Sequence, residues 1–142
     1  MPVASSITRG TTINELPWWA FLYAAAIAAM GLVTAVSFVR RQAPWWYTAA
    51  QSLSTLGLLG FVAGHWNLDV RYSLGRMWLL VFLGVFMWEL FFLGQRLVAV
   101  LPRTAARDSL AARVEVVWLL GRGLFIAPAI VAGAAFAYRI WF

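Results

Sequence analysis

Long apolar stretches separated by short polar segments make up almost the whole chain. A helix needs about 20 mostly apolar residues to cross the bilayer core. Four stretches meet this need, at about residues 16–39, 45–64, 77–98 and 116–138. A polar N-terminal segment, 1–15, precedes them, and a charged, alanine-rich segment, 102–115, separates the last two. The pattern predicts four membrane-spanning helices, with 102–115 as a short interfacial helix or as an extension of the fourth span.

Composition gives the same fold class. The chain is 63% hydrophobic and 11% charged, whereas about 25% of the residues of a soluble protein are charged. This excludes a cytosolic enzyme, a disordered tail and a nucleic-acid-binding module. With no internal repeat or domain boundary, we expect an all-α, integral membrane four-helix bundle that forms a single domain. The net charge of +6 fits arginines that flank the spans and contact anionic lipid.

Tryptophan, which concentrates at membrane interfaces, supports four spans. We name the side of the N-terminus side Y and the side of the loop between the first two spans side X. The tryptophans then fall at boundary Y (Trp18, Trp19, Trp66, Trp78, Trp141), at boundary X (Trp45, Trp46, Trp118) or deeper (Trp88). Side X carries six arginines and side Y four. The positive-inside tendency therefore predicts a multi-pass protein of the cell membrane with both termini outside the cytoplasm.

Small residues recur at four-residue spacing in the spans, as in Gly31 with Ala35 and in Ala129, Gly133 and Ala137. Such stripes let helices approach closely in lipid, where hydrophobic burial cannot drive association. They suit the packing of one bundle and equally suit contacts between copies. Pro128 is expected to kink the fourth span, because it removes a backbone hydrogen bond.

Two charges of opposite sign fall inside the apolar spans. Glu89 lies seven residues before Arg96, which is roughly 10 Å along a helix. Arg122 lies nine residues after Arg113, at a comparable depth from side X. Because the third and fourth spans run antiparallel, and because a lone charge in the membrane is costly, we predict a Glu89–Arg122 ion pair.

Other polar side chains fall at a similar depth and complete a predicted polar pocket. Gln51 and Thr55 share one helical face, as do Glu115 and Arg122. The functional interpretation is a site or pathway for a proton, an ion, a lipid headgroup or a quinone-like ligand. The alternative is a buried salt bridge that only fixes helix register.

A second cluster lies at boundary Y, where His65, Asp69 and Arg71 follow the second span. His65 and Asp69 share a face if this turn is helical, and a carboxylate beside an imidazole can support proton transfer. The chain has no cysteine and one histidine, so no metal site is predicted within it. The cofactor stays open, since His65 could also be an axial ligand in an assembly that shares a tetrapyrrole.

Three functions remain, because the sequence has no phosphate-binding loop and no hydrolase or metalloprotease motif. The first is an accessory or anchor subunit of a larger membrane complex. The second is a homo-oligomeric channel or small transporter, with Glu89 and Arg122 along a path between protomers. The third is a membrane-embedded enzyme acting on a lipid or isoprenoid, with Glu89 as acid or base. The expected partners are membrane lipid and either other membrane subunits or copies of the chain, with no nucleic acid.

Overall fold

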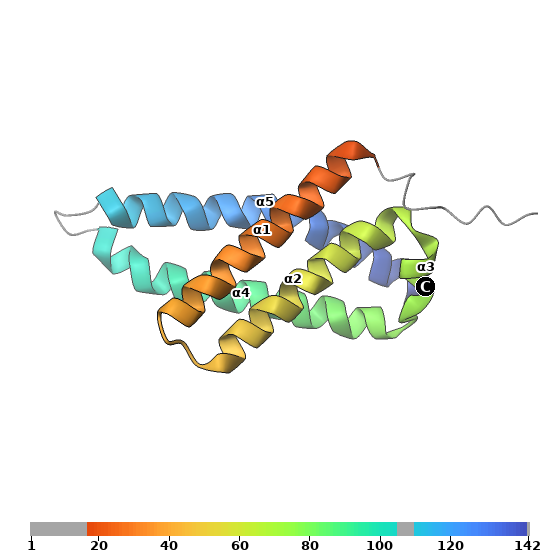
Figure 1. Cartoon of the computed structure of the whole chain (residues 1–142), viewed down its shortest axis with the longest axis horizontal. Helices are drawn as coiled ribbons and strands as arrows, with labels where there is room; N and C mark the ends of the chain where they lie inside the picture. The colour runs from red at the N-terminus through yellow and green to blue at the C-terminus, as the bar shows by residue number, and fades with distance from the viewer. Residues whose placement is uncertain (1–16, 105–109, 142) are drawn as a thin grey trace, which may run out of the picture.

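The computed structural model describes residues 17–104 and 110–141, and these residues form helices and turns with no strand. The all-α prediction is therefore confirmed. In chain order the elements are α1 (Trp18–Arg40), α2 (Trp45–Trp66), α3 (Leu68–Ser73), α4 (Met77–Thr104) and α5 (Leu110–Trp141). Figure 1 shows the pair α1 and α2 crossing over the pair α4 and α5.

Local sequence explains where the helices begin and end. Pro17 and Pro44 stand immediately before α1 and α2, and proline is compatible with a helix start because the first N–H groups have no intrahelical partner. Asn67 separates α2 from α3 with an extended backbone, and its side chain caps α3 by accepting a hydrogen bond from the backbone nitrogen of Asp69 at 2.9 Å. Gly75, with φ +50°, occupies the turn before α4.

Two predicted polar segments reach beyond these bounds. Segment 1–15 lies outside the described residues. Of segment 102–115, residues 105–109 also lie outside them, α4 runs to Thr104, and α5 starts at Leu110. The last part of this segment therefore belongs to the first turns of α5 and is not a separate interfacial helix.

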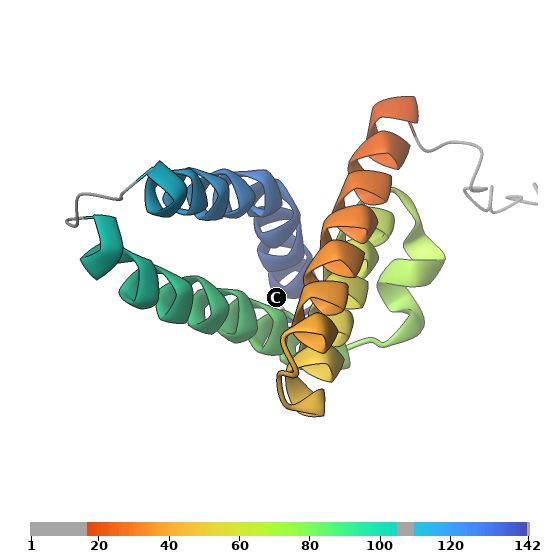
Figure 2. The same cartoon turned by 60° about the vertical axis from the view of Figure 1, so that its left-hand side comes forward.

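Helix α2 is the centre of the bundle, since it packs against α1, α4 and α5. Close approach depends on glycine at each contact. A Cβ added to Gly31 would overlap Thr55, one added to Gly57 would overlap Val85, and one added to Gly133 would lie 2.7 Å from the Phe61 ring. Because real Cβ atoms do not come so close, these glycines set how near the helices can lie. In Figure 2, α1 and α2 lie together on one side, while α4 and α5 extend past them.

Proline changes the course of α5. Pro128 lies inside this helix, and Figure 2 shows the ribbon turning along its C-terminal half, as the sequence predicts. The Tyr23 hydroxyl of α1 donates a 2.7 Å hydrogen bond to the backbone oxygen of Phe125. A neighbouring helix therefore supplies a donor to a backbone oxygen three residues before the proline.

Among the residues that the structure describes, three helices are long and apolar enough to cross a membrane, namely Trp18–Arg40, Met77–Pro102 and Leu110–Trp141. The chain is therefore consistent with a multi-pass membrane protein. Helix α2, the second predicted span, is not among the three, although it has 22 residues. The physical reason is its run of polar side chains near Gln51 and Thr55, which lowers its mean hydropathy.

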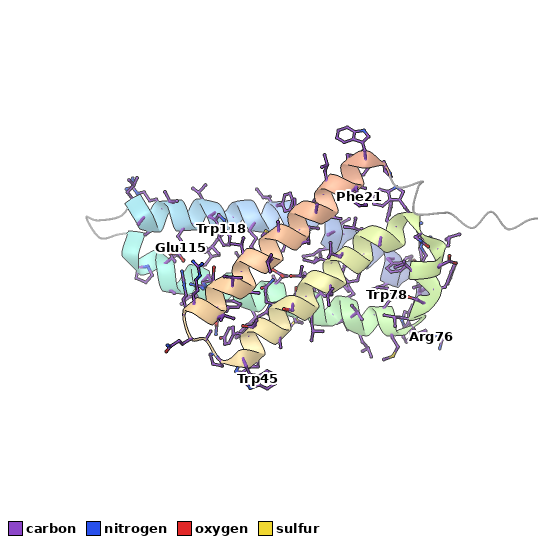
Figure 3. The ribbon with its side chains drawn as sticks, in the orientation of Figure 1. Phe21, Trp45, Arg76, Trp78, Glu115 and Trp118 are labelled. Carbon is purple, nitrogen blue, oxygen red and sulfur yellow. The ribbon has the colours of Figure 1, made fainter. Side chains whose placement is uncertain are left out.

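Aromatic contacts gather at both ends of the bundle. The rings of Trp19 and Trp66 lie 5.2 Å apart, and the Arg76 guanidinium lies 5.4 Å from the Trp141 ring, so four residues assigned to side Y meet as two pairs. Figure 3 shows Trp78 and Arg76 at one end of the long axis and Trp45, Glu115 and Trp118 toward the other. This separation matches the two tryptophan groups predicted from the sequence.

The glycine contacts give a direct test of packing. Replacing Gly133 with valine should destabilise the bundle by about 1–3 kcal/mol, because the added methyl groups overpack against Phe61. The measurement is SDS-induced unfolding in mixed micelles. Gly84→Val is the matched control, since a Cβ at Gly84 meets nothing within 4 Å. Equal losses in both variants would contradict the role assigned to close approach.

Candidate functional site

The predicted ion pair is present at the centre of the bundle. Arg122 on α5 donates from Nη2 to Oε2 of Glu89 on α4, at 2.8 Å. Each residue is only 5% exposed. The pair forms because the antiparallel helices α4 and α5 bring the two positions to the same depth.

Helix α2 completes the polar cluster. Ser54 Oγ donates a 2.6 Å hydrogen bond to Oε1 of Glu89, so both carboxylate oxygens accept a hydrogen bond. Gln51 Oε1 accepts from Arg122 Nη2 at 3.4 Å and from Trp88 Nε1 at 3.3 Å. The two polar residues of α2 thus bind one member of the ion pair each, which fixes α2 against α4 and α5.

Thr55 belongs to this cluster only indirectly. Its hydroxyl accepts a 3.3 Å hydrogen bond from Nε2 of Gln51 and donates to the backbone oxygen of the same residue. Thr55 therefore orients the Gln51 carboxamide so that its oxygen faces Arg122. The predicted sharing of a face by Gln51 and Thr55 is present in the structure.

Arg122 keeps donor capacity that the described residues do not use. Its Nε and Nη1 atoms are buried and have no hydrogen-bond partner among residues 17–104 and 110–141. Its Cζ lies 4.2 Å from the centre of the Phe92 ring, a cation–π contact that supports the charge without accepting its N–H groups in conventional hydrogen bonds. Because buried donors are nearly always satisfied, an unpaired guanidinium edge is unusual and calls for an explanation.

A cavity of about 320 Å³ lies beside this guanidinium, between α4 and α5. Its buried floor contains Glu89, Phe92 and Arg122, and exposed Leu90 and Val131 also line it. All of its lining residues come from α4 and α5. The cavity is therefore apolar apart from the ion pair, and it opens toward the outer surface of these two helices.

Glu115 does not join the cluster, contrary to the sequence prediction. It lies about two turns from Arg122 on α5, close to side X, where its Oε1 is 3.8 Å from Nη1 of Arg96. Both side chains are partly exposed. Helical spacing places Glu115 and Arg122 on one face, but seven residues also separate them by roughly 10 Å along the axis.

The second predicted cluster, at boundary Y, differs from the prediction, because its contacts are those of a helix end. Because Asn67 interrupts the helix, His65 and Asp69 do not share a helical face, and the described residues show no hydrogen bond between them. Arg71 donates from Nε to the backbone oxygen of Gly64 at 3.0 Å and from Nη2 to that of His65 at 2.9 Å. Arg71 thus caps the C-terminal end of α2, a favourable place for a cation.

Two members of the site, Phe92 and Trp88, escaped the sequence analysis as site residues. Phe92 lies three positions after Glu89, so helical periodicity places it on a face that was already marked. Trp88 was recognised only as the tryptophan that lies deeper than the others. Ser54 is one of the polar residues that the sequence places at the depth of Gln51, but its contact with Glu89 was not predicted. A search of the Glu89 face for aromatic rings would have found Phe92.

The cluster combines one buried ion pair with neutral side chains that hydrogen-bond to it. Within the described residues no group of three or more histidine, cysteine, aspartate or glutamate side chains could hold a metal ion. In comparisons with family models, curated proteins and solved structures, none matches this chain. Arg122, whose charge Glu89 neutralises, lines the apolar cavity and keeps two nitrogens without a hydrogen-bond partner among the described residues.

The ion pair predicts strong coupling between its two partners. Glu89→Gln should destabilise the protein by about 3–5 kcal/mol, because it leaves the buried Arg122 charge without its partner. Adding Arg122→Gln should recover part of that loss, as measured by SDS-induced unfolding in mixed micelles.

The exposed pair supplies the control for this cycle. Arg96→Gln combined with Glu115→Gln should show a coupling of only about 0–1 kcal/mol. Losses for Glu89 and Arg122 that add to within about 0.5 kcal/mol would mean that the two side chains are energetically independent.

Proposed function

We propose that the protein binds a lipid-like ligand within the membrane, in the cavity between α4 and α5. The observation that carries this proposal is the pair of unused nitrogens on buried Arg122, which lines a cavity of about 320 Å³. Small-molecule sites occupy about 300–1,000 Å³ and combine apolar walls with a few polar groups. This cavity has that composition at the lower end of that range, which suits a ring or headgroup whose chain leaves toward lipid.

Charge balance favours a neutral ligand. Glu89 and Arg122 already neutralise each other, so an anionic ligand would bring an uncompensated charge into a medium of low dielectric constant. A carbonyl oxygen accepts the N–H groups of Arg122 without adding charge. A quinone-like ring, or the ester or amide of a lipid, has this chemistry together with an apolar body.

The geometry favours binding over the other two functions. Both carboxylate oxygens of Glu89 accept hydrogen bonds from Ser54 and Arg122, so neither oxygen can contact a ligand as acid or base without losing one of these partners. A sideways opening toward lipid is what a lipid enzyme also needs, so the cavity alone does not separate binding from catalysis. Burial of the ion pair within one chain counts against a path between protomers.

In this proposal α2 also crosses the membrane, as a fourth span in a single-domain bundle. Its 22 residues extend about 33 Å as a helix, and its buried polar side chains Gln51 and Ser54 contact α4 and α5, where lipid does not reach them. A role as an accessory subunit, with other membrane proteins or copies of itself, extends the proposal. The large exposed apolar side chains of all four long helices are compatible with lipid and with such partners.

A ligand-dependent stability measurement tests the proposal. Decylubiquinone, added to the full chain in mild detergent, should raise its melting temperature; a ligand at 100 times its Kd stabilises a protein by about 2.7 kcal/mol. Decanoate, which has the same apolar length but a negative charge, should give a smaller shift.

Two glycines of α5 provide matched variants. Gly123 lines the cavity and a Cβ there meets only Leu93, at 3.9 Å, whereas a Cβ at Gly121 meets nothing within 4 Å. Gly123→Phe should fill the cavity and abolish the shift, while Gly121→Phe should retain it. Ala127→Phe, also within the lining, repeats the test if Gly123→Phe does not fold. Equal shifts in all variants would place the binding elsewhere.

A further inference from the structure

Two arginines line two neighbouring hollows near side X, both distinct from the cavity described above. Arg41 is the C-cap residue of α1, and Arg96 lies toward the C-terminal end of α4. Both line a groove of about 370 Å³ bordered by α1, α4 and α5, and both line a neighbouring hollow of about 300 Å³ reached from the start of α2. The two guanidinium groups thus come from different helices and border the same spaces.

The charges at this groove do not balance. Its acidic lining residue is Glu115, whose Oε1 lies 3.8 Å from Nη1 of Arg96, which is longer than a hydrogen bond. Arg41 has no acidic partner within the described residues. Two positive charges against one negative charge leave a local charge of +1, which a single negative charge on a ligand would neutralise.

The rest of the groove is apolar. Phe38 on α1 and Leu119 on α5 are buried in its lining, and exposed Val33 and Trp118 extend it. Trp118 belongs to the tryptophans of boundary X, so the arginines lie at the depth of lipid headgroups and the apolar lining lies at the depth of acyl chains. Figure 3 shows Trp118 and Glu115 side by side on α5 at this end.

We propose that this groove binds an anionic phospholipid. Arg41 and Arg96 hold its phosphate, since guanidinium groups match phosphate in charge and in hydrogen-bond geometry. One acyl chain lies along Val33, Phe38 and Trp118. The site adjoins the proposed ligand cavity, with which it shares Phe92 and Leu119 in its lining, but it does not depend on that ligand and requires only that side X meets a lipid headgroup layer.

The proposed phosphate and the Glu115 carboxylate compete for the guanidinium of Arg96. A phosphate at Arg96 must share the guanidinium with Glu115, so the carboxylate weakens binding of any anion at this position. Removing the negative charge of Glu115 should therefore strengthen lipid binding. A purely structural role for the Arg96–Glu115 contact does not predict such a gain.

The experiment measures which lipid stays with the full chain. Protein in mild detergent is titrated with phosphatidylglycerol or with phosphatidylcholine of the same acyl chains, and bound lipid is counted by native mass spectrometry. Phosphatidylglycerol should bind more tightly. Arg41→Gln with Arg96→Gln should weaken it about 25-fold, roughly a factor of five for each arginine, and Glu115→Gln should tighten it.

Neighbouring arginines give the control. Arg40 has the same charge and adjoins Arg41, but it does not line either hollow, so Arg40→Gln should weaken binding clearly less than the factor of about five expected for Arg41→Gln. An equal loss for Arg40→Gln and Arg41→Gln would show that only general surface charge matters and would overturn the proposal. Inorganic phosphate that competes as well as the lipid would overturn it too, because the groove would then contribute nothing to affinity.

Discussion

A carboxylate and a guanidinium meet in the interior of this bundle, and the three central helices are arranged around them. Either charge alone would cost several kcal/mol in a bilayer. Pairing lowers that cost only when the remaining hydrogen-bond capacity is also satisfied. For Glu89 this is complete, with one oxygen bound to Arg122 and the other to Ser54. For Arg122 it is partial, since Nε and Nη1 have no partner among the described residues, and the same side chain lines the cavity.

The position of α2 follows from the same constraint. This helix carries the polar side chains that serve the ion pair, so it must lie where lipid does not contact them. Glycines on α1, α2 and α5 allow that central position, because a larger residue at Gly31, Gly57 or Gly133 would hold the helices apart. The polar side chains lower the mean hydropathy of α2, so this helix resembles a membrane span less than its neighbours do.

Depth and charge were enough to predict the ion pair, because isolated opposite charges in apolar spans have few other partners. Helical periodicity was enough to predict that Gln51 and Thr55 share one helical face, where they are in contact. Periodicity failed for Glu115, since a shared face does not imply a shared depth. It failed for His65 and Asp69 because Asn67 prefers to cap α3 over continuing α2. A polar pocket centred on the ion pair was predicted, but the apolar walls of the cavity and its place between α4 and α5 were not, since they depend on the course of these two helices in space.

Phe92 has a consequence for how the two hollows behave together. Its ring centre lies 4.2 Å from Cζ of Arg122 and 5.7 Å from Cζ of Arg96, and it forms part of the wall of both hollows. Rotation of this one ring therefore changes the shape of both spaces at once. Occupation of either space that favours one rotamer must alter affinity in the other by the same factor. A single aromatic side chain thus forms a thermodynamic link between the headgroup layer and the interior of the membrane.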